Sequence, residues 1–90
     1  MQLPDVNVLI YAHREDAPEH ERYAAWLRAL TESDEPFAVS EGVLASVIRI
    51  VTNPKIFHPA SPTDVAVAFC QRLVDWPRAV MIVPSPRQSD

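Results

Sequence analysis

Two acidic residues, Asp5 and Glu41, occupy positions from which both could bind one metal ion. Asp5 lies at the end of a short extended segment over residues 2–6, and Glu41 directly follows a short apolar run over residues 36–40. Ligands of open parallel sheets bind at the carboxyl ends of the strands. If the two segments are adjacent strands, their carboxylates meet in one crevice and supply the oxygen ligands that Mg²⁺ prefers.

An alternative interpretation of the same two residues needs no metal. A carboxylate in the first turn of a helix is stabilised by the positive end of the helix dipole. Glu41 would then only favour the start of a helix, and Asp5 would cap the turn that follows it. The spacing alone leaves both interpretations open.

The remaining chemically capable side chains form no ligand or nucleophile pattern. The three histidines are widely spaced, and a single cysteine, Cys70, permits no intramolecular disulfide. Cys70 lies beside the apolar stripe of a predicted helix, so we expect it in the core. With Gly42 as the only glycine, a P-loop and a glycine-rich dinucleotide motif are both excluded, because each needs several glycines.

Proline positions and apolar spacing predict the elements that position Asp5. Pro4 lacks an N–H donor and biases the preceding residue toward an extended backbone. The apolar run at residues 7–12 suits a strand or a buried helix, and we favour a short helix. A second helix is expected from Pro18 through about Thr31, with proline and acids in its first turn.

The segment after residue 40 is predicted to be helical and to carry Glu41 in its first turn. Ser40 can cap a helix over residues 41–53, whose apolar residues recur at three- and four-residue spacing and so bury one face. Arg49 then points toward the opposite side of this helix.

Two further elements follow. A helix is expected to begin with Ser61 as N-cap and Pro62 at the first helical position, and to end at residues 76–77. Residues 79–83 form a near-continuous apolar run of strand length, which suits a strand buried on both faces. The order strand, helix, helix, strand, helix, helix, strand predicts an α/β fold with a parallel sheet and right-handed crossovers. We expect the first strand to be central.

Composition limits the class of protein. The 90 residues are enough for one domain at most, with an apolar share of 48% and a net charge of −4. Residues 1–45 carry nine acids and three Lys or Arg, whereas residues 46–90 carry three acids and five Lys or Arg, which argues against sequence-blind coating of DNA. No apolar stretch approaches the ~18 residues of a membrane span, and no secretory signal is visible, so we expect a cytoplasmic protein without membrane contact.

Two motifs carry a resemblance to a known family. The segment LPDVNVLIYA at residues 3–12 resembles the opening of PIN-domain toxins of the VapC type, and VIRIVTNP at residues 47–54 resembles the helix end of one of their subfamilies. The apolar strand near Met81 also falls where such toxins place theirs. The resemblance implies a three-layer PIN-like fold, a parallel sheet flanked by helices, with its C-terminal part absent. Residues 1–84 would form the truncated domain and residues 85–90 a polar tail.

The resemblance also implies a function and a set of site residues. VapC toxins are RNA endonucleases in which clustered acids hold Mg²⁺ or Mn²⁺. Asp5 matches the family's first acid, and Asn7 matches a position where a small polar side chain supports the site, although Asn7 could equally cap a helix. The commoner family pattern has Glu where this chain has Ser46, so we expect Glu41 to substitute as second acid. Arg49 is a candidate contact with RNA.

Partners and competing functions follow from the same resemblance. A cognate antitoxin and a second copy of the chain are the expected protein partners. The family's remaining acids lie beyond the third strand, so we expect the 90-residue piece alone to be inactive. A non-catalytic truncated homologue that binds an antitoxin or another subunit is the alternative function. A receiver domain or a haloacid-type phosphatase also places Asp after a first strand, but the phosphatase pattern needs a second Asp where Asn7 stands.

Overall fold

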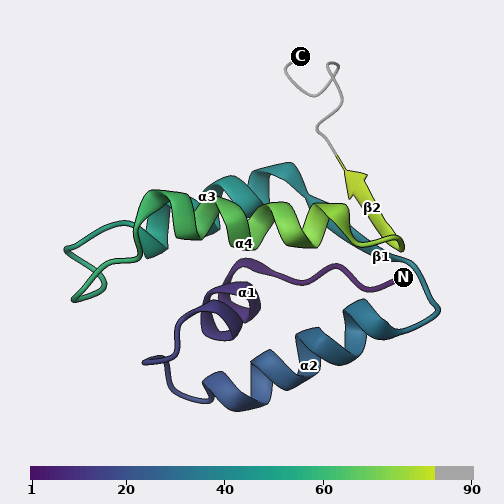
Figure 1. The fold of residues 1–90 in the computed structure, drawn as a ribbon, viewed down its shortest axis with the longest axis horizontal. Coiled ribbons are helices and arrows are strands. Elements are labelled where there is room, and N and C mark those ends of the chain that lie inside the picture. The colour runs from purple at the N-terminus through teal and green to yellow at the C-terminus, as the bar shows by residue number, and fades with distance from the viewer. Residues whose placement is uncertain (83–90) are drawn as a thin grey trace.

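Residues 1–82 are described by a computed structural model, and within them four helices accompany a small parallel sheet that lies at one end of the helices (Figure 1). The elements in chain order are α1 (Val6–His13), α2 (His20–Glu32), β1 (Phe37–Ser40), α3 (Glu41–Val51), α4 (Thr63–Asp75) and β2 (Ala79–Ile82). The N-terminal segment runs between two pairs of helices, with α3 and α4 on one side and α1 and α2 on the other. The α/β class predicted from the sequence is therefore confirmed for this part of the chain.

The sheet is built around β1. Its residues pair in parallel with β2, from Phe37 opposite Ala79 to Ser40 opposite Ile82. On the other side of β1, Gln2 forms a parallel bridge with Phe37, and its carbonyl accepts a hydrogen bond of 2.7 Å from the Ala38 N–H. The predicted parallel pairing is confirmed.

The predicted strand order is wrong for the described residues, because β1 and not the first segment is central. The first segment is also no strand over residues 2–6, since it pairs only through Gln2. Two local causes shorten it. Pro4 has no N–H to give to a ladder, and Val6 already belongs to α1.

Local capping explains where α1 and α3 begin. Asp5 is the N-cap of α1, and Ser40 is the N-cap of α3, where its Oγ accepts a hydrogen bond of 3.3 Å from the Val43 N–H. The predictions of a short helix after Asp5 and of Ser40 as a cap are confirmed. The α3 helix ends at Val51, two residues before the predicted end.

The starts of α2 and α4 differ from the sequence prediction. The α2 helix begins at His20 rather than Pro18, because Glu19 adopts a left-handed backbone conformation with φ of 61°. At α4 the cap position is held by Pro62, and no side chain caps the helix. The predicted cap, Ser61, instead directs its hydroxyl toward His13 and Arg14.

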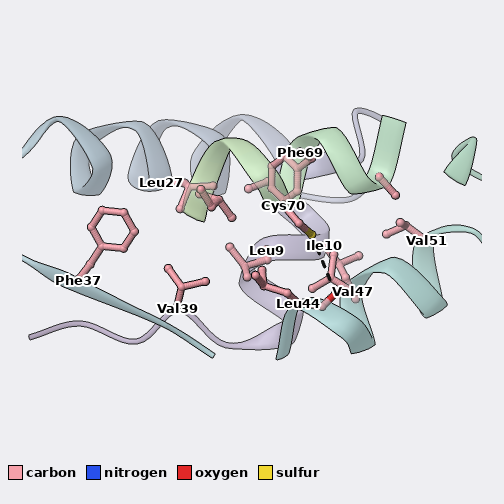
Figure 2. Close-up of a cluster of buried hydrophobic side chains, with 13 residues drawn as sticks. Leu9, Ile10, Leu27, Phe37, Val39, Leu44, Val47, Val51, Phe69 and Cys70 are labelled. Atoms are coloured by element: carbon pink, nitrogen blue, oxygen red, sulfur yellow. Dashed lines mark hydrogen bonds between the residues drawn. The ribbon is translucent and has the colours of Figure 1, made fainter. Parts of the chain in front are cut away.

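The core lies between β1 and the helices, and all four helices contribute buried side chains to it (Figure 2). Phe37, Leu9, Val47 and Val51 have no more than 2% of their surface exposed. Cys70 is buried among them, as predicted, and its Sγ lies 4.0 Å from the Leu44 carbonyl oxygen. The core thus joins the two helices that follow Asp5 and Ser40 to α4 and to Leu27 of α2.

The strand β2 is more exposed than predicted. Val80, Met81 and Ile82 have 42%, 40% and 46% of their surface exposed, so the expectation of a strand buried on both faces is wrong for these residues. Val83, the predicted domain end at residue 84 and the predicted tail lie outside the described residues. Among the helices of residues 1–82, none combines the length and apolarity needed to cross a membrane.

The left-handed conformation of Glu19 predicts an unusual effect of glycine. A residue with a Cβ is strained there, so Glu19→Gly should raise the free energy of unfolding by about 0.5 to 1 kcal/mol, even though glycine gains entropy in the unfolded chain. Loss of the exposed ion pair with Arg22 should matter little. In the matched control, Glu21→Gly in the first turn of α2 should lower stability by about 1 kcal/mol. Urea denaturation measures the stability of both variants. An equal loss of stability in the two would contradict the left-handed conformation of Glu19.

Candidate functional site

The two predicted site acids lie at the starts of two helices that leave the same edge of the sheet. Gln2 is level with Phe37 in the parallel bridge, and three residues later come Asp5 and Ser40, the caps of α1 and α3. Glu41 is the first residue of α3. Both helices therefore begin at the carboxyl edge of the sheet. The two helices also pack against each other. Asp5 and Glu41 are exposed, and their sharing of one ion stays a prediction.

The carboxylate of Asp5 is held in place by the backbone of α1. Its Oδ1 accepts a hydrogen bond of 2.8 Å from the Asn7 N–H, and the backbone of Asp5 is extended. Within the described part of the chain Oδ2 accepts no hydrogen bond, so it remains available to a cation. The capping interpretation of Asp5 is therefore correct, and it leaves one carboxylate oxygen for binding. Asn7 is not the cap: it lies in the first turn of α1 with an exposed side chain.

Glu41 and Ser46 differ in their distance from the edge. Glu41 opens α3, whereas Ser46 lies five residues further, about 7.5 Å along the helix axis. The Ser46 hydroxyl accepts a hydrogen bond of 3.3 Å from the Arg49 guanidinium. A charged group at the edge is thus offered by Glu41 and not by Ser46. Arg49 is exposed on α3, as predicted, and its contact with RNA stays a prediction.

Electrostatics favours negative charge at this edge. The N-terminus of an α-helix carries about half a positive charge, and both α1 and α3 begin at this edge of the sheet. Backbone N–H groups of a first turn also bind phosphate oxygens. The arrangement suits carboxylates that hold a hard cation and a phosphodiester beside it.

Within residues 1–82, the candidate site has only the carboxylates of Asp5 and Glu41 to offer a metal ion. No group of three or more His, Cys, Asp or Glu side chains in this part of the chain is placed to hold a metal ion. Asp64 and Asp75 are exposed on α4 and belong to no such group. The chemistry of the donors fits Mg²⁺ or Mn²⁺, because carboxylate oxygens are their preferred protein ligands, but two carboxylates alone hold such an ion weakly.

A second polar cluster, which the sequence analysis did not find, lies at the other end of α1. Arg14, the C-cap of α1, has only 9% of its surface exposed, and its guanidinium donates two hydrogen bonds to Asp16 and one of 3.2 Å to the Ser61 Oγ. The guanidinium also lies 4.5 Å from the centre of the Phe57 ring. His13 Nε2 lies 3.0 Å from the same Ser61 Oγ. The spacing of Arg14 and Asp16 signals an ion pair, but nothing local signals its burial.

Two pKa values are shifted in this cluster. Burial, with the nearby charges of Arg14 and Arg72, lowers the pKa of the His13 imidazole below its ordinary 6.5. The hydrogen bond from Arg14 lowers the pKa of the Asp16 carboxyl. His13 is therefore neutral at pH 7, while Asp16 is ionised and paired.

Comparison with known proteins finds ribonucleases. Ribonuclease VapC43 of Mycobacterium tuberculosis is 44% identical to this chain over 84 residues, which are 92% of this chain and 56% of that protein. Ribonuclease VapC25 of the same organism is 41% identical over 87 residues, 97% of this chain and 61% of that protein, and Ribonuclease VapC31 is 40% identical over the same span. The chain thus covers less than two thirds of these curated relatives. No protein-family model matches it.

The capping role of Asp5 predicts that its hydrogen bond and its charge can be separated. Asp5→Ala should lower the free energy of unfolding by about 1 kcal/mol, because the Asn7 N–H loses its acceptor. Asp5→Asn and Asp5→Ser should stay close to the wild type, since Asn and Ser cap equally well. Asp34→Ala, at an exposed turn residue, is the control and should change stability by less than about 0.5 kcal/mol. Thermal unfolding of all four variants checks this, and equal losses for Asp5→Ala and Asp5→Asn would contradict it.

The lowered pKa of His13 predicts a loss of stability in mild acid. The unfolded chain takes up a proton at the ordinary histidine pKa of 6.5, whereas folded His13 does so only at lower pH. The melting temperature should therefore fall as the pH drops from 7 toward 5, above the range in which Asp16 titrates. His13→Gln should show a smaller fall over this range. His58→Gln, at an exposed histidine, should behave as the wild type, and a full acid response in His13→Gln would exclude His13 as its source.

Proposed function

Because this chain is 40–44% identical to VapC ribonucleases over the part of those proteins that it spans, we propose that it belongs to their family and is an endoribonuclease that hydrolyses RNA phosphodiesters. We further propose that it acts as the toxin of a toxin–antitoxin system and that the reaction depends on Mg²⁺ or Mn²⁺. The observation that carries the proposal is the start of two adjacent helices, with Asp5 and Glu41, at one edge of a parallel sheet.

In this proposal each residue of the edge has a defined task. Asp5 and Glu41 hold the cation, and the Asn7 N–H orients the Asp5 carboxylate by its hydrogen bond to Oδ1. When bound, the divalent cation supplies Lewis acidity and neutralises charge that develops on the phosphate. The first-turn N–H groups of α1 and α3 add positive potential for the RNA backbone. Arg49, exposed on α3, is a candidate contact for a neighbouring phosphate.

Two carboxylates do not complete such a site. Since no third ligand is placed nearby within residues 1–82, we propose that further acids come from outside these residues. The three-layer PIN-like fold, with additional elements on the sheet, belongs to the same proposal. The 90-residue chain by itself would then cleave RNA poorly.

The proposed protein partners are a cognate antitoxin and a second copy of the chain. The described structure leaves several large apolar side chains exposed, and these are available to such a partner. They include Trp26 on α2, Trp76 after α4, and the β2 residues Val80, Met81 and Ile82.

A non-catalytic binding module is the second candidate function. One observation favours it, namely that the described residues place no group of three metal-ligating side chains together. Such a module would keep the fold and bind an antitoxin or another subunit without cutting RNA. It differs from the first proposal in needing no charge at Asp5.

An RNA cleavage assay with two chain lengths separates the two candidates. The chain of residues 1–90 and a chain extended to the full length of the relatives are incubated with RNA and Mg²⁺ or Mn²⁺, with EDTA as control. We expect EDTA-sensitive cleavage by the extended chain and little or none by residues 1–90. In the extended chain Asp5→Asn should reduce the rate by at least about a hundredfold, because it removes a ligand charge and keeps the cap. Asp75→Asn, at an exposed acid on α4, should keep wild-type activity.

The outcomes are distinct. Full activity of the extended Asp5→Asn variant would remove Asp5 from the site. Absence of cleavage by the extended wild type, together with binding to an antitoxin, would support the binding module instead. Robust EDTA-sensitive cleavage by residues 1–90 would show that no ligands beyond this chain are needed.

A further inference from the structure

Ser61 joins the far ends of the two helices that begin at the candidate site. Its backbone N–H donates a hydrogen bond of 2.8 Å to the carbonyl of Val51, the last residue of α3. Its Oγ lies 3.0 Å from Nε2 of His13, the last residue of α1, and accepts a hydrogen bond of 3.2 Å from Arg14. One residue, with 8% of its surface exposed, therefore binds both C-terminal ends at once.

Arg14 makes this junction rigid. Its planar guanidinium is fixed by two hydrogen bonds to Asp16 and lies over the ring of Phe57, which belongs to the connection between α3 and α4. A guanidinium held on several sides has little freedom left, so the hydroxyl that it meets is held as well. The junction thus links the turn after α1 to the connection after α3.

The helices between the junction and the candidate site are short and tightly packed. The α1 helix has 8 residues and α3 has 11, so they span about 12 Å and 16 Å. Leu9 of α1 and Val47 of α3 are almost fully buried, which leaves no space for one helix to slide freely past the other. We therefore expect a shift at the C-terminal ends to displace Asp5 and Glu41 as well.

We propose that Ser61, supported by Arg14, is a positioning residue of the Asp5 and Glu41 site. By fixing the C-terminal ends of α1 and α3 relative to each other, it fixes the relative placement of their N-terminal ends, and so of the two carboxylates. The inference rests on the proposed function, because it assumes that these carboxylates bind a cation. It assigns to Ser61 a role beyond the stability that any buried, hydrogen-bonded hydroxyl provides.

The test compares Ser61→Ala with a matched change elsewhere in the full-length protein. Thr31→Ala is the control: Thr31 is also buried, and its hydroxyl also donates a hydrogen bond, but it lies on α2, which carries no candidate site residue. Ser61→Thr restores the hydroxyl and adds one methyl group at a residue that borders an open surface depression. Mn²⁺ affinity is measured by electron paramagnetic resonance, and the backbone amide shifts of Asn7 and Val43 by NMR.

We expect Ser61→Ala to weaken Mn²⁺ binding about tenfold, as loss of a group that orients metal ligands does. It should also shift the amide signals of Asn7 and Val43, which report the caps of α1 and α3. Thr31→Ala should change neither, whatever it costs in melting temperature. Ser61→Thr should bind Mn²⁺ within about twofold of the wild type, since it keeps the hydroxyl.

The contradicting outcomes separate this inference from the proposed function. If Asp5→Asn leaves Mn²⁺ affinity unchanged, the proposed metal site is wrong and the inference fails with it. If Asp5→Asn abolishes binding but Ser61→Ala binds as the wild type does, or if Thr31→Ala weakens binding as much, only the positioning role is overturned. If Ser61→Ala does not fold, Arg14→Lys serves as the second variant, because lysine keeps the positive charge but lacks the planar guanidinium that binds Asp16 and Ser61 together. Wild-type Mn²⁺ affinity in that variant would also overturn the role.

Discussion

The parallel pairing of β1 with a neighbour on each side is the constraint on which the other features depend. The Ala38 N–H donates to the Gln2 carbonyl on one side, and the Phe37 N–H donates to the Arg78 carbonyl on the other. Parallel neighbours cannot be joined by a tight turn, so the chain must return through helices that cover the sheet. The short ladder therefore determines that α1 and α3 begin at the same edge, and buried side chains of both helices join Phe37 and Val39 of β1 in one core cluster (Figure 2).

Local signals predicted most of the elements, because capping and apolar spacing act within a few residues. Ser40 as a cap, the helix after it and the buried Cys70 all follow from such signals. Strand order does not, since the partners of Phe37 are residues 2 and 79, far away in sequence. The prediction of a central first strand was wrong because no residue of that segment indicates which strand it pairs with.

Ser61 shows a different limit of local reasoning. A serine before a proline and an acid has the pattern of an N-cap, and a side-chain hydroxyl beside a helix start usually accepts from that helix. Here His13 and Arg14, from an element 47 to 48 residues away, compete for the same hydroxyl. The tertiary partner wins because the burial of Arg14 requires acceptors for its N–H groups, whereas the first turn of α4 has solvent-exposed residues on either side of its start. A local pattern cannot reveal such a competitor.

The two helix starts at this edge combine capping and negative charge in different ways. At the start of α3 the tasks are divided: Ser40, a neutral residue, accepts from the first turn, and Glu41 adds the negative charge. At the start of α1 one residue does both, since Oδ1 of Asp5 accepts from the Asn7 N–H while the same carboxylate carries the charge. Capping alone would be served equally well by Asn or Ser at this position. The property that distinguishes Asp5 is therefore its charge, and the cap holds that charge in one orientation at the edge where α1 and α3 begin.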